Sequence, residues 1–204
     1  MRTLAIDCAT EACSIALFDD RELIAWHHDV IGRGHAERLV PLIAELPERG
    51  RADHILVSLG PGSFTGVRIG LAAARALGLA WGAEVLGYPT LALVAAMARE
   101  HHPGPATVCM TGGHGEWFVQ DFGADGTPES EMASLEPEDA TQIASHEIVA
   151  GSQAKALVER RGSGRALAIL PDARHAIALP GALLTAELSP IYGRGPDAKL
   201  PQAR

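Results

Sequence analysis

The segment 60–70 constrains the fold most, because it reads Gly-Pro-Gly-Ser-Phe-Thr-Gly-Val-Arg-Ile-Gly between an expected strand and an expected helix. The apolar run His54–Leu59 predicts a buried strand, and the residues after the turn predict a long helix. Thr65 is the predicted N-cap, with Phe64 and Ile69 spaced for a hydrophobic staple. Such a junction fits either a structural turn or an anion held by backbone amides. Its glycine spacing misses the dinucleotide fingerprint by one residue, so we expect a structural turn.

Small residues recur every four positions along the predicted helix, at Gly66, Gly70, Ala74, Gly78 and Gly82. This spacing places them in one stripe along the helix. A glycine inside a helix costs about 0.5–1 kcal/mol relative to alanine, so several of them need an offsetting gain. Close approach of another backbone supplies that gain. Two alternatives stay open, which are packing on the chain's own sheet and a helix–helix contact with a partner subunit.

Strand-like runs and turns alternate at the start of the chain. Three closely spaced runs predict an antiparallel meander: Arg2–Ile6, Ser14–Phe18 and Leu23–His28. A helical pattern follows at 34–46, in which Pro41 predicts either a kink or the true start of the helix. Further on, Val85–Gly87 predicts a strand, and a helix is expected from Thr90 to about Glu100.

The clearest break in the chain is the segment His101-His102-Pro103-Gly104-Pro105. We therefore expect a first lobe at 1–102 and a second, smaller lobe with a C-terminal tail at 103–204. Strands and helices alternate in both halves, which indicates an α/β protein. In the second half the expected strands are 107–110, 117–122, 148–150 and 166–170, and the expected helices are 137–144, 152–161 and, more weakly, 173–188.

Charge and composition exclude several classes of protein. The 204 residues carry 17 basic and 25 acidic side chains, a formal charge of −8, which argues against autonomous binding to a nucleic acid. Neither of the two lysines, Lys155 and Lys199, follows a glycine, so no P-loop is present. Asp7 and Glu11 interrupt the N-terminal apolar run before it reaches the length of a secretory signal, and no apolar stretch is long enough to span a membrane. We expect a cytoplasmic protein with no membrane partner.

The candidate catalytic residues do not have the spacing of known catalytic or metal-binding motifs. Asp7 ends the first predicted strand, where it could position a metal or a water beside a phosphate. The turn after it holds Cys8 and Ala9 instead of glycines, so a turn-capping aspartate is the favoured interpretation. The chain has no serine elbow, no histidine pair at helical metal spacing and no C-x-x-C pair. We nominate no catalytic, metal-binding or cofactor-binding residue.

Taken together, these motifs resemble the bacterial TsaB (YeaZ) family. The resemblance covers essentially the whole chain and is densest in the first half. It rests on the opening strand and turn at 4–14, on His35 with Glu37-Arg38-Leu39 and Pro41, and above all on the signature turn at 60–70. It also includes Pro190-Ile191-Tyr192 with Arg194, and Lys199-Leu200-Pro201. Its structural motif residues here are Asp7, Thr10, Gly60, Gly62, Phe64, Thr65, Gly66 and Arg68.

The resemblance implies a two-lobed acetate kinase/Hsp70/actin-like (RNase H-like) fold with a shortened second lobe. It also implies a non-catalytic subunit of the machinery that makes threonylcarbamoyladenosine in tRNA. In that machinery TsaD transfers the threonylcarbamoyl group from its adenylate to the adenosine beside the anticodon of ANN-decoding tRNAs. TsaB pairs with TsaD, the ATPase TsaE docks on the pair, and TsaB alone forms a homodimer through the same face. The contact residues implied for this chain are His35, Arg38, Leu39, Leu42, Ile43, Val67, Gly70, Leu71, Ala74 and Gly78.

The second lobe departs from the family pattern. The family's strand there runs into Asp-Ala-Arg before Gly-Glu, whereas this chain has Thr111-Gly112-Gly113-His114 before Gly115-Glu116. The missing carboxylate argues against ATP hydrolysis by this chain, so ATP and the threonylcarbamoyl-adenylate are expected to belong to the complex. The alternatives are an active ATPase or phosphotransferase of the same superfamily, based on Asp7, and a peptidase-like protein. Contact of Arg194 or Lys199 with tRNA stays open.

Overall fold

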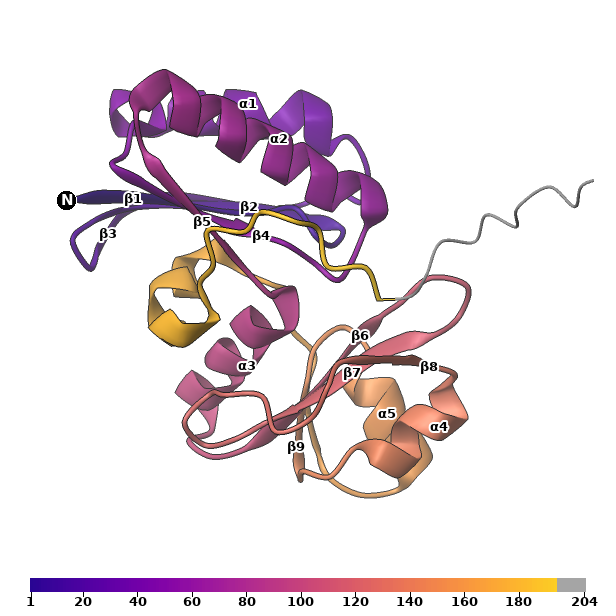
Figure 1. Ribbon diagram of the computed structural model, residues 1–204. Coiled ribbons are helices and arrows are strands. Elements are labelled where there is room, and N and C mark those ends of the chain that lie inside the picture. Colours follow the sequence, from indigo (N-terminus) through magenta and orange to yellow (C-terminus); the bar gives the residue numbers. More distant parts are fainter. Residues whose placement is uncertain (194–204) are drawn as a thin grey trace, which may run out of the picture.

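The computed structural model describes residues 1–193 and contains two mixed β-sheets of five strands each (Figure 1). Arg194 and Lys199 lie outside the described residues. The first sheet has the strand order β3-β2-β1-β4-β5. Its antiparallel part confirms the predicted meander, and β4 and β5 then run parallel to β1. The strands are β1 (Arg2–Asp7), β2 (Ala12–Asp19), β3 (Glu22–Val30), β4 (His54–Ser58) and β5 (Glu84–Tyr88).

The second sheet has the order β10-β9-β6-β7-β8 and is built from shorter strands. Its centre is the predicted hairpin, in which Thr111 pairs with Trp117 across a turn at 112–116. Three of its strands have only three residues each. The strands are β6 (Ala106–Thr111), β7 (Trp117–Phe122), β8 (Ala133–Leu135), β9 (Ile148–Ala150) and β10 (Arg165–Leu167).

Helices cover the outer face of each sheet, and a further helix lies between the two sheets (Figure 1). Helices α1 (His35–Glu45) and α2 (Phe64–Trp81) pack on the outer face of the first sheet. Helix α3 (Thr90–His101) lies between the sheets, and α4 (Pro137–Ile143) and α5 (Ala154–Arg161) cover the second sheet's far face. A short 3-10 turn at Pro47–Gly50 follows α1. Helix α1 begins at His35 and continues through Pro41, so the interpretation of Pro41 as the true helix start was wrong.

Helix α3 forms the centre of the largest core. Its residues 91–98 are all buried, because the helix contacts both sheets and has no solvent-facing side there. The run Leu-Ala-Leu-Val-Ala-Ala-Met-Ala suits this position, since alanines allow close approach and the larger side chains fill the space between the sheets. A helix that is apolar all round is expected to be buried in this way.

The predicted helix at 173–188 was wrong. Only two 3-10 turns form there, η2 (Ala173–Ala178) and η3 (Gly181–Leu183), because Pro180-Gly181 interrupts the segment. The chain then returns to the first sheet. Thr185 exchanges two backbone hydrogen bonds with Gly87 in β5, and Ile191 N–H donates to the Leu59 carbonyl at 2.7 Å. The division at residue 102 stays a prediction, and this C-terminal segment crosses it. No helix within residues 1–193 is long and apolar enough to cross a membrane.

Leu93→Ala tests the central position of α3. Leu93 is fully buried between the sheets, so the change is expected to lower the free energy of unfolding by about 2–5 kcal/mol. Leu79→Ala is the matched control, because that side chain is 88% exposed on α2 and its loss should change stability by less than about 0.5 kcal/mol. Urea unfolding of both variants measures the difference. Equal effects would contradict this placement of α3.

Candidate functional site

The signature turn brings the first turn of α2 against the loop between β1 and β2. Ser63 N–H donates to the Ala9 carbonyl at 2.6 Å. A Cβ at Gly62 would overlap the Ala9 carbonyl, and one at Gly66 would overlap the Cys8 carbonyl. The two glycines therefore admit a neighbouring backbone of the same chain. This contact confirms the interpretation of the segment as a structural turn.

The cap of α2 differs from the prediction. Ser63, two residues before Thr65, accepts a hydrogen bond from Gly66 N–H at 3.2 Å and is the N-cap. The helix consequently begins at Phe64, and Thr65 is an exposed residue of its first turn. The Phe64–Ile69 staple was therefore also wrong. Gly60 lies just before this turn with a φ of +92°, and a Cβ there would approach the Ile191 carbonyl to 2.9 Å.

The stripe of small residues on α2 packs on the chain's own sheet. Gly70 lies over Ile6 and Val57, and a Cβ at Gly78 would overlap the Val85 side chain. Ala74 is fully buried between these positions. Of the two alternatives, packing on the sheet is therefore the one that the structure contains. Val67 and Leu71 are buried in the same core, so all five of these α2 residues face the sheet, and their use in a partner contact stays a prediction.

The predicted contact residues of α1 are also mostly buried. His35 is only 6% exposed, and its Nε2 lies 3.2 Å from the Ala12 carbonyl, so that ring nitrogen is the donor. Leu39, Leu42 and Ile43 belong to the core between α1 and the sheet. They share the helix face that buries apolar surface, which is why the helical pattern singled them out. Only Arg38 is exposed, and it pairs with Asp29 at 2.8 Å.

The exposed sides of α1 and α2 carry a second set of small and apolar residues. On α2 the alanines at 72, 76 and 80 are again four residues apart. Each lies two positions after a residue of the buried stripe, which is a rotation of about 200° around the helix axis. Val40 is 57% exposed and Leu79 is 88% exposed. We call this surface the outer helix face. It consists of Ala36, Val40, Ala44, Ala72, Ala76, Leu79 and Ala80.

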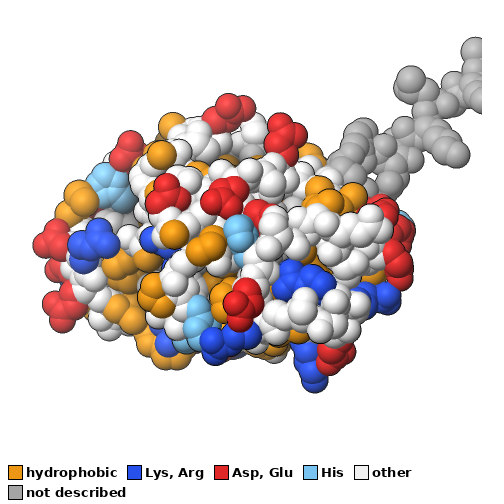
Figure 2. Space-filling view, turned by 90° about the horizontal axis from the view of Figure 1, so that it is seen from below, with side chains coloured by type: hydrophobic (Ala, Val, Ile, Leu, Met, Phe, Trp, Pro, Cys, Tyr) orange, Lys and Arg blue, Asp and Glu red, His pale blue; other side chains and the backbone are white. Residues whose placement is uncertain are grey.

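The outer helix face is free of charged residues, although charged side chains border it. Glu37 and Arg75 are among these exposed neighbours. The side of the molecule seen in Figure 2, from below the view of Figure 1, mixes acidic, basic and apolar side chains instead. The repeat of alanines at 72, 76 and 80 could have identified this face from the sequence. The glycine stripe concealed it, because both sets recur every four residues.

Asp7 caps the β1–β2 turn, as predicted. Its Oδ1 accepts a hydrogen bond from Ala9 N–H at 2.9 Å. Its Oδ2 lies 3.2 Å from the Tyr88 hydroxyl, which also lies 3.0 Å from the Ile6 carbonyl. The Tyr88 hydroxyl is the donor in both contacts, so its one proton is shared between the Ile6 carbonyl and Asp7. Burial raises the pKa of Asp7 to about 6 and outweighs the hydrogen bonds from Ala9 N–H and the Tyr88 hydroxyl, which lower it.

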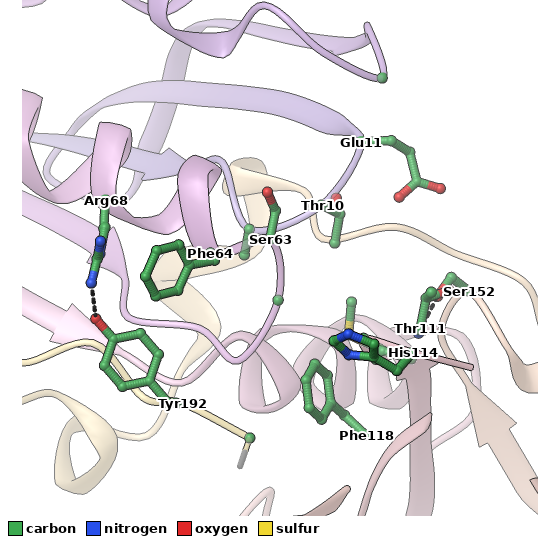
Figure 3. Close-up of a pocket in the computed structure, with 17 residues that line it drawn as sticks. Thr10, Glu11, Ser63, Phe64, Arg68, Thr111, His114, Phe118, Ser152 and Tyr192 are labelled. Carbon is green, nitrogen blue, oxygen red and sulfur yellow. Dashed lines mark hydrogen bonds between the residues drawn. The ribbon is translucent and has the colours of Figure 1, made fainter. Parts of the chain in front are cut away.

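A cleft of about 960 Å³ opens between the two lobes (Figure 3). The β1–β2 turn and the start of α2 line it on the first lobe, and the β6–β7 turn lines it on the second. Asp7 is buried beneath the turn and does not line the cleft. Arg68 donates a hydrogen bond to the Tyr192 hydroxyl at 3.0 Å across the cleft's aromatic side. No sequence pattern identifies Tyr192 as a partner of Arg68, because 124 residues separate them.

Backbone amides around the cleft have partners within the chain. Ala9 N–H donates to Asp7, Ala12 N–H to Thr10 Oγ1, and Gly66 N–H to Ser63. In the second lobe, Thr111 N–H donates to Ser152 Oγ and Gly112 N–H to the Glu116 carbonyl. These amides are therefore not directed at a phosphate. Within residues 1–193, no group of three or more His, Cys, Asp or Glu side chains could hold a metal ion.

In sequence, this chain is similar to proteins named for threonylcarbamoyladenosine in tRNA. A family model described as "TsaD: tRNA N6-adenosine threonylcarbamoyltransferase" matches residues 28–151. A "tRNA threonylcarbamoyladenosine biosynthesis protein TsaB" from Escherichia coli is 44% identical over 102 residues, which cover 47% of this chain and 43% of that protein. One of the same name from Haemophilus influenzae is 38% identical over 106 residues, covering 48% and 44%. The matched segments thus span less than half the length of these curated relatives.

The solved structure of YeaZ from Pseudomonas aeruginosa extends the match to the whole fold. It superposes with a TM-score of 0.79 at 28% identity and covers 94% of this chain and 99% of the YeaZ chain. The expected α/β fold is confirmed, and the chain shares its two mixed sheets and their helices with YeaZ.

Two substitutions in the buried stripe of α2 test the close backbone approach. Gly66→Ala should destabilise the protein, because its Cβ meets the Cys8 carbonyl. Gly70→Ala should raise the free energy of unfolding by up to about 1 kcal/mol, because its Cβ makes ordinary contacts at 3.7–3.8 Å and alanine favours the helix. Urea unfolding measures both. If both variants changed the free energy of unfolding in the same direction, the proposed difference between Gly66 and Gly70 would be refuted.

Asp7→Asn tests the protonation of the buried carboxyl. A folded-state pKa near 6, above the ordinary 3.8, stabilises the fold fully below pH 3.8, and this stabilisation is lost as pH rises through 6. Wild type should lose about 2–3 kcal/mol between pH 4 and pH 7 relative to the variant, measured by urea unfolding. Asp172→Asn is a control of opposite sign, because hydrogen bonds from Arg174 outweigh burial and lower the pKa of Asp172. Parallel wild-type and Asp7→Asn profiles would exclude a raised pKa.

Proposed function

We propose, since this chain belongs to the TsaB (YeaZ) family, that it acts in the biosynthesis of threonylcarbamoyladenosine in tRNA. Its role there is that of a non-catalytic subunit that binds the catalytic subunit TsaD. TsaE docks on the pair, and ATP and the threonylcarbamoyl-adenylate are used by the complex. Because tRNA is reached only through the complex, the formal charge of −8 is compatible with this role. The site of action is the cytoplasm.

The outer helix face is the observation that carries this proposal. It presents alanines, Val40 and Leu79 on two adjacent helices without a charged residue among them. Alanines let another helix approach closely, and the exposed Val40 and Leu79 supply apolar surface for burial. The cores of protein interfaces are depleted of charged residues in the same way. The helices are those that the family resemblance implied, but the contact uses their opposite sides. The homodimer expected without TsaD would use the same face.

The residues and hydrogen bonds of the two turns that line the cleft support a non-catalytic role. Ala9 and Cys8 occupy the first-lobe turn, whose amides bond within the chain. The second-lobe turn at 111–115 contains no carboxylate. A phosphotransferase stabilises developing charge with donors or metal ions aimed at the transferring group. This geometry favours the subunit role over the alternative of an active ATPase.

Ala76→Glu and Leu79→Glu test the outer helix face. Each places a carboxylate in the centre of the proposed contact, where it would be desolvated without a partner, so co-purification with TsaD should fall at least tenfold. Both side chains are exposed, so the monomer should keep its stability. Ala124→Glu is the matched control, because Ala124 is an exposed alanine in the loop after β7. In a reconstituted tRNA modification assay, Ala76→Glu and Leu79→Glu should lower the extent of modification more than Ala124→Glu does.

Retained TsaD binding by both variants would contradict this use of the outer helix face. Loss of binding by Ala124→Glu alone would place the contact on the second lobe. Full modification of tRNA in a reaction that lacks this chain would refute the subunit role itself.

A further inference from the structure

Two cysteine thiols lie side by side across the base of the β1–β2 turn. The Sγ atoms of Cys8 and Cys13 are 3.9 Å apart, and both cysteines are free and buried. Strands β1 and β2 pair antiparallel as far as Asp7 and Ser14, and the next pair in that register is Cys8 with Cys13. Both side chains belong to the core between the first sheet and its two covering helices, α1 and α2. They are therefore direct cross-strand neighbours on one face of the sheet.

The geometry of this pair is close to that of a disulfide. Directly opposite residues of an antiparallel pair have Cα atoms about 4.5–5.5 Å apart. This separation lies inside the range of about 4.4–6.8 Å that disulfides span. To form the bond, the two sulfur atoms have to move from 3.9 Å to about 2.05 Å apart. Rotation of the two side chains and a small adjustment of the turn at 9–12 supply this approach.

The two thiols differ in acidity. The hydrogen bond between the two sulfur atoms lowers the pKa of the Cys13 thiol, and burial opposes this effect. The same hydrogen bond, together with burial, raises the pKa of Cys8 well above its ordinary value. Cys13 therefore loses its proton first, and the Cys8 S–H donates to its sulfur. Since the thiolate is the nucleophile in cysteine chemistry, Cys13 is the reactive member of the pair.

From this arrangement we propose that Cys8 and Cys13 form a reversible disulfide by reaction with a small hydroperoxide. With hydrogen peroxide, the Cys13 thiolate attacks one oxygen, the O–O bond breaks, and the hydroxide that leaves takes up the Cys13 proton. The product on Cys13 is a sulfenic acid. The Cys8 sulfur then attacks the Cys13 sulfur, the S–O bond breaks, and the second hydroxide takes up the Cys8 proton. Two thiols and one hydrogen peroxide thus give one disulfide and two waters. A dithiol reductant reverses the reaction by thiol–disulfide exchange.

Burial of the pair favours a small oxidant. Cys8 is 1% exposed and Cys13 is 0% exposed, so an oxidant has to enter through a local opening of the structure. The neighbour of Cys13 on β3 is Asp29, whose carboxylate pairs with Arg38 at the surface. Ion pairs at the surface contribute little to stability, so this one opens readily. We expect hydrogen peroxide to reach the Cys13 sulfur by this path.

A disulfide at this position would fasten the turn against which α2 packs. A Cβ at Gly66 would overlap the Cys8 carbonyl, and Ser63 N–H donates to the Ala9 carbonyl at 2.6 Å. A cross-link at the base of the turn limits its opening away from α2, so it should protect the Ser63 amide. This inference goes beyond the proposed subunit role and does not depend on it, because the reaction needs no partner protein.

Treatment of the folded, full chain with hydrogen peroxide tests the site. The tryptic peptide 3–21 contains both cysteines. After alkylation under denaturing conditions without reduction, this peptide should carry no alkyl group and should have lost the mass of two hydrogen atoms. Dithiothreitol should restore alkylation of both thiols. Cys109 should stay alkylated throughout, because burial raises its pKa to about 12. Cys109→Ser, the matched control, should form the disulfide at the wild-type rate.

Cys8→Ser and Cys13→Ser separate the roles of the two sulfur atoms. Cys8→Ser should leave a sulfenic acid on Cys13 that dimedone traps, whereas Cys13→Ser should give about tenfold less dimedone adduct on Cys8. In the wild type, the disulfide should slow hydrogen exchange of the Ser63 amide about threefold and leave exchange in β6 unchanged.

Three results would overturn the proposal. The first is that peroxide produces no disulfide within the peptide 3–21. The second is that Cys109 reacts as fast as Cys13, which would indicate global unfolding instead of a reactive pair. The third is equal exchange of the Ser63 amide in the reduced and oxidised proteins. None of these results bears on TsaD binding.

Discussion

Backbone packs on backbone where the β1–β2 turn meets the first turn of α2, with Ser63 N–H bonded to the Ala9 carbonyl and no side chains at Gly62 and Gly66 to separate them. This contact sets the height of α2 above the first sheet. Further along the helix the glycines face side chains of the sheet, with ordinary contacts at Gly70 and a tight one to Val85 at Gly78. It determines which side of α2 is buried, and it places the β1–β2 turn at the edge of the interlobe cleft. The outer helix face and the cleft both depend on it.

Local patterns in the sequence were enough to predict the β1–β2–β3 meander, α2, the β6–β7 hairpin and the structural role of Asp7. They were not enough to orient the helices. A four-residue repeat shows that residues share a face, but only the position of the sheet determines whether that face is buried. The buried stripe at Gly70 and the exposed stripe at Ala76 have equal spacing, so the sequence pattern cannot tell which of the two faces solvent. The predicted helix at 173–188 does not form because Pro180-Gly181 interrupts it, and η2 packs on β1, β2, β3 and α3, which are distant along the chain.

The cleft was beyond sequence analysis for a related reason. Its lining joins Phe64 to Tyr192, and Thr10 to Ser152. None of these pairs is close in sequence, and each residue type is common on surfaces. What distinguishes them is that they line one cleft, which exists only after the two lobes have come together. The signature turn was visible in the sequence because all its parts are contiguous.

The return of the chain to the first sheet has a consequence for how the protein is made. At the edge of β5, Gly87 exchanges backbone hydrogen bonds with Thr185. Ile191 N–H donates a backbone hydrogen bond to the Leu59 carbonyl. A ribosome adding roughly 5–20 residues per second reaches Thr185 many seconds after Gly87. During that interval the first sheet has an open edge, and the second lobe is built before the first is finished. An open strand edge can pair with other extended chains, and the backbone bonds made by Thr185 close this edge at Gly87 only near the end of synthesis.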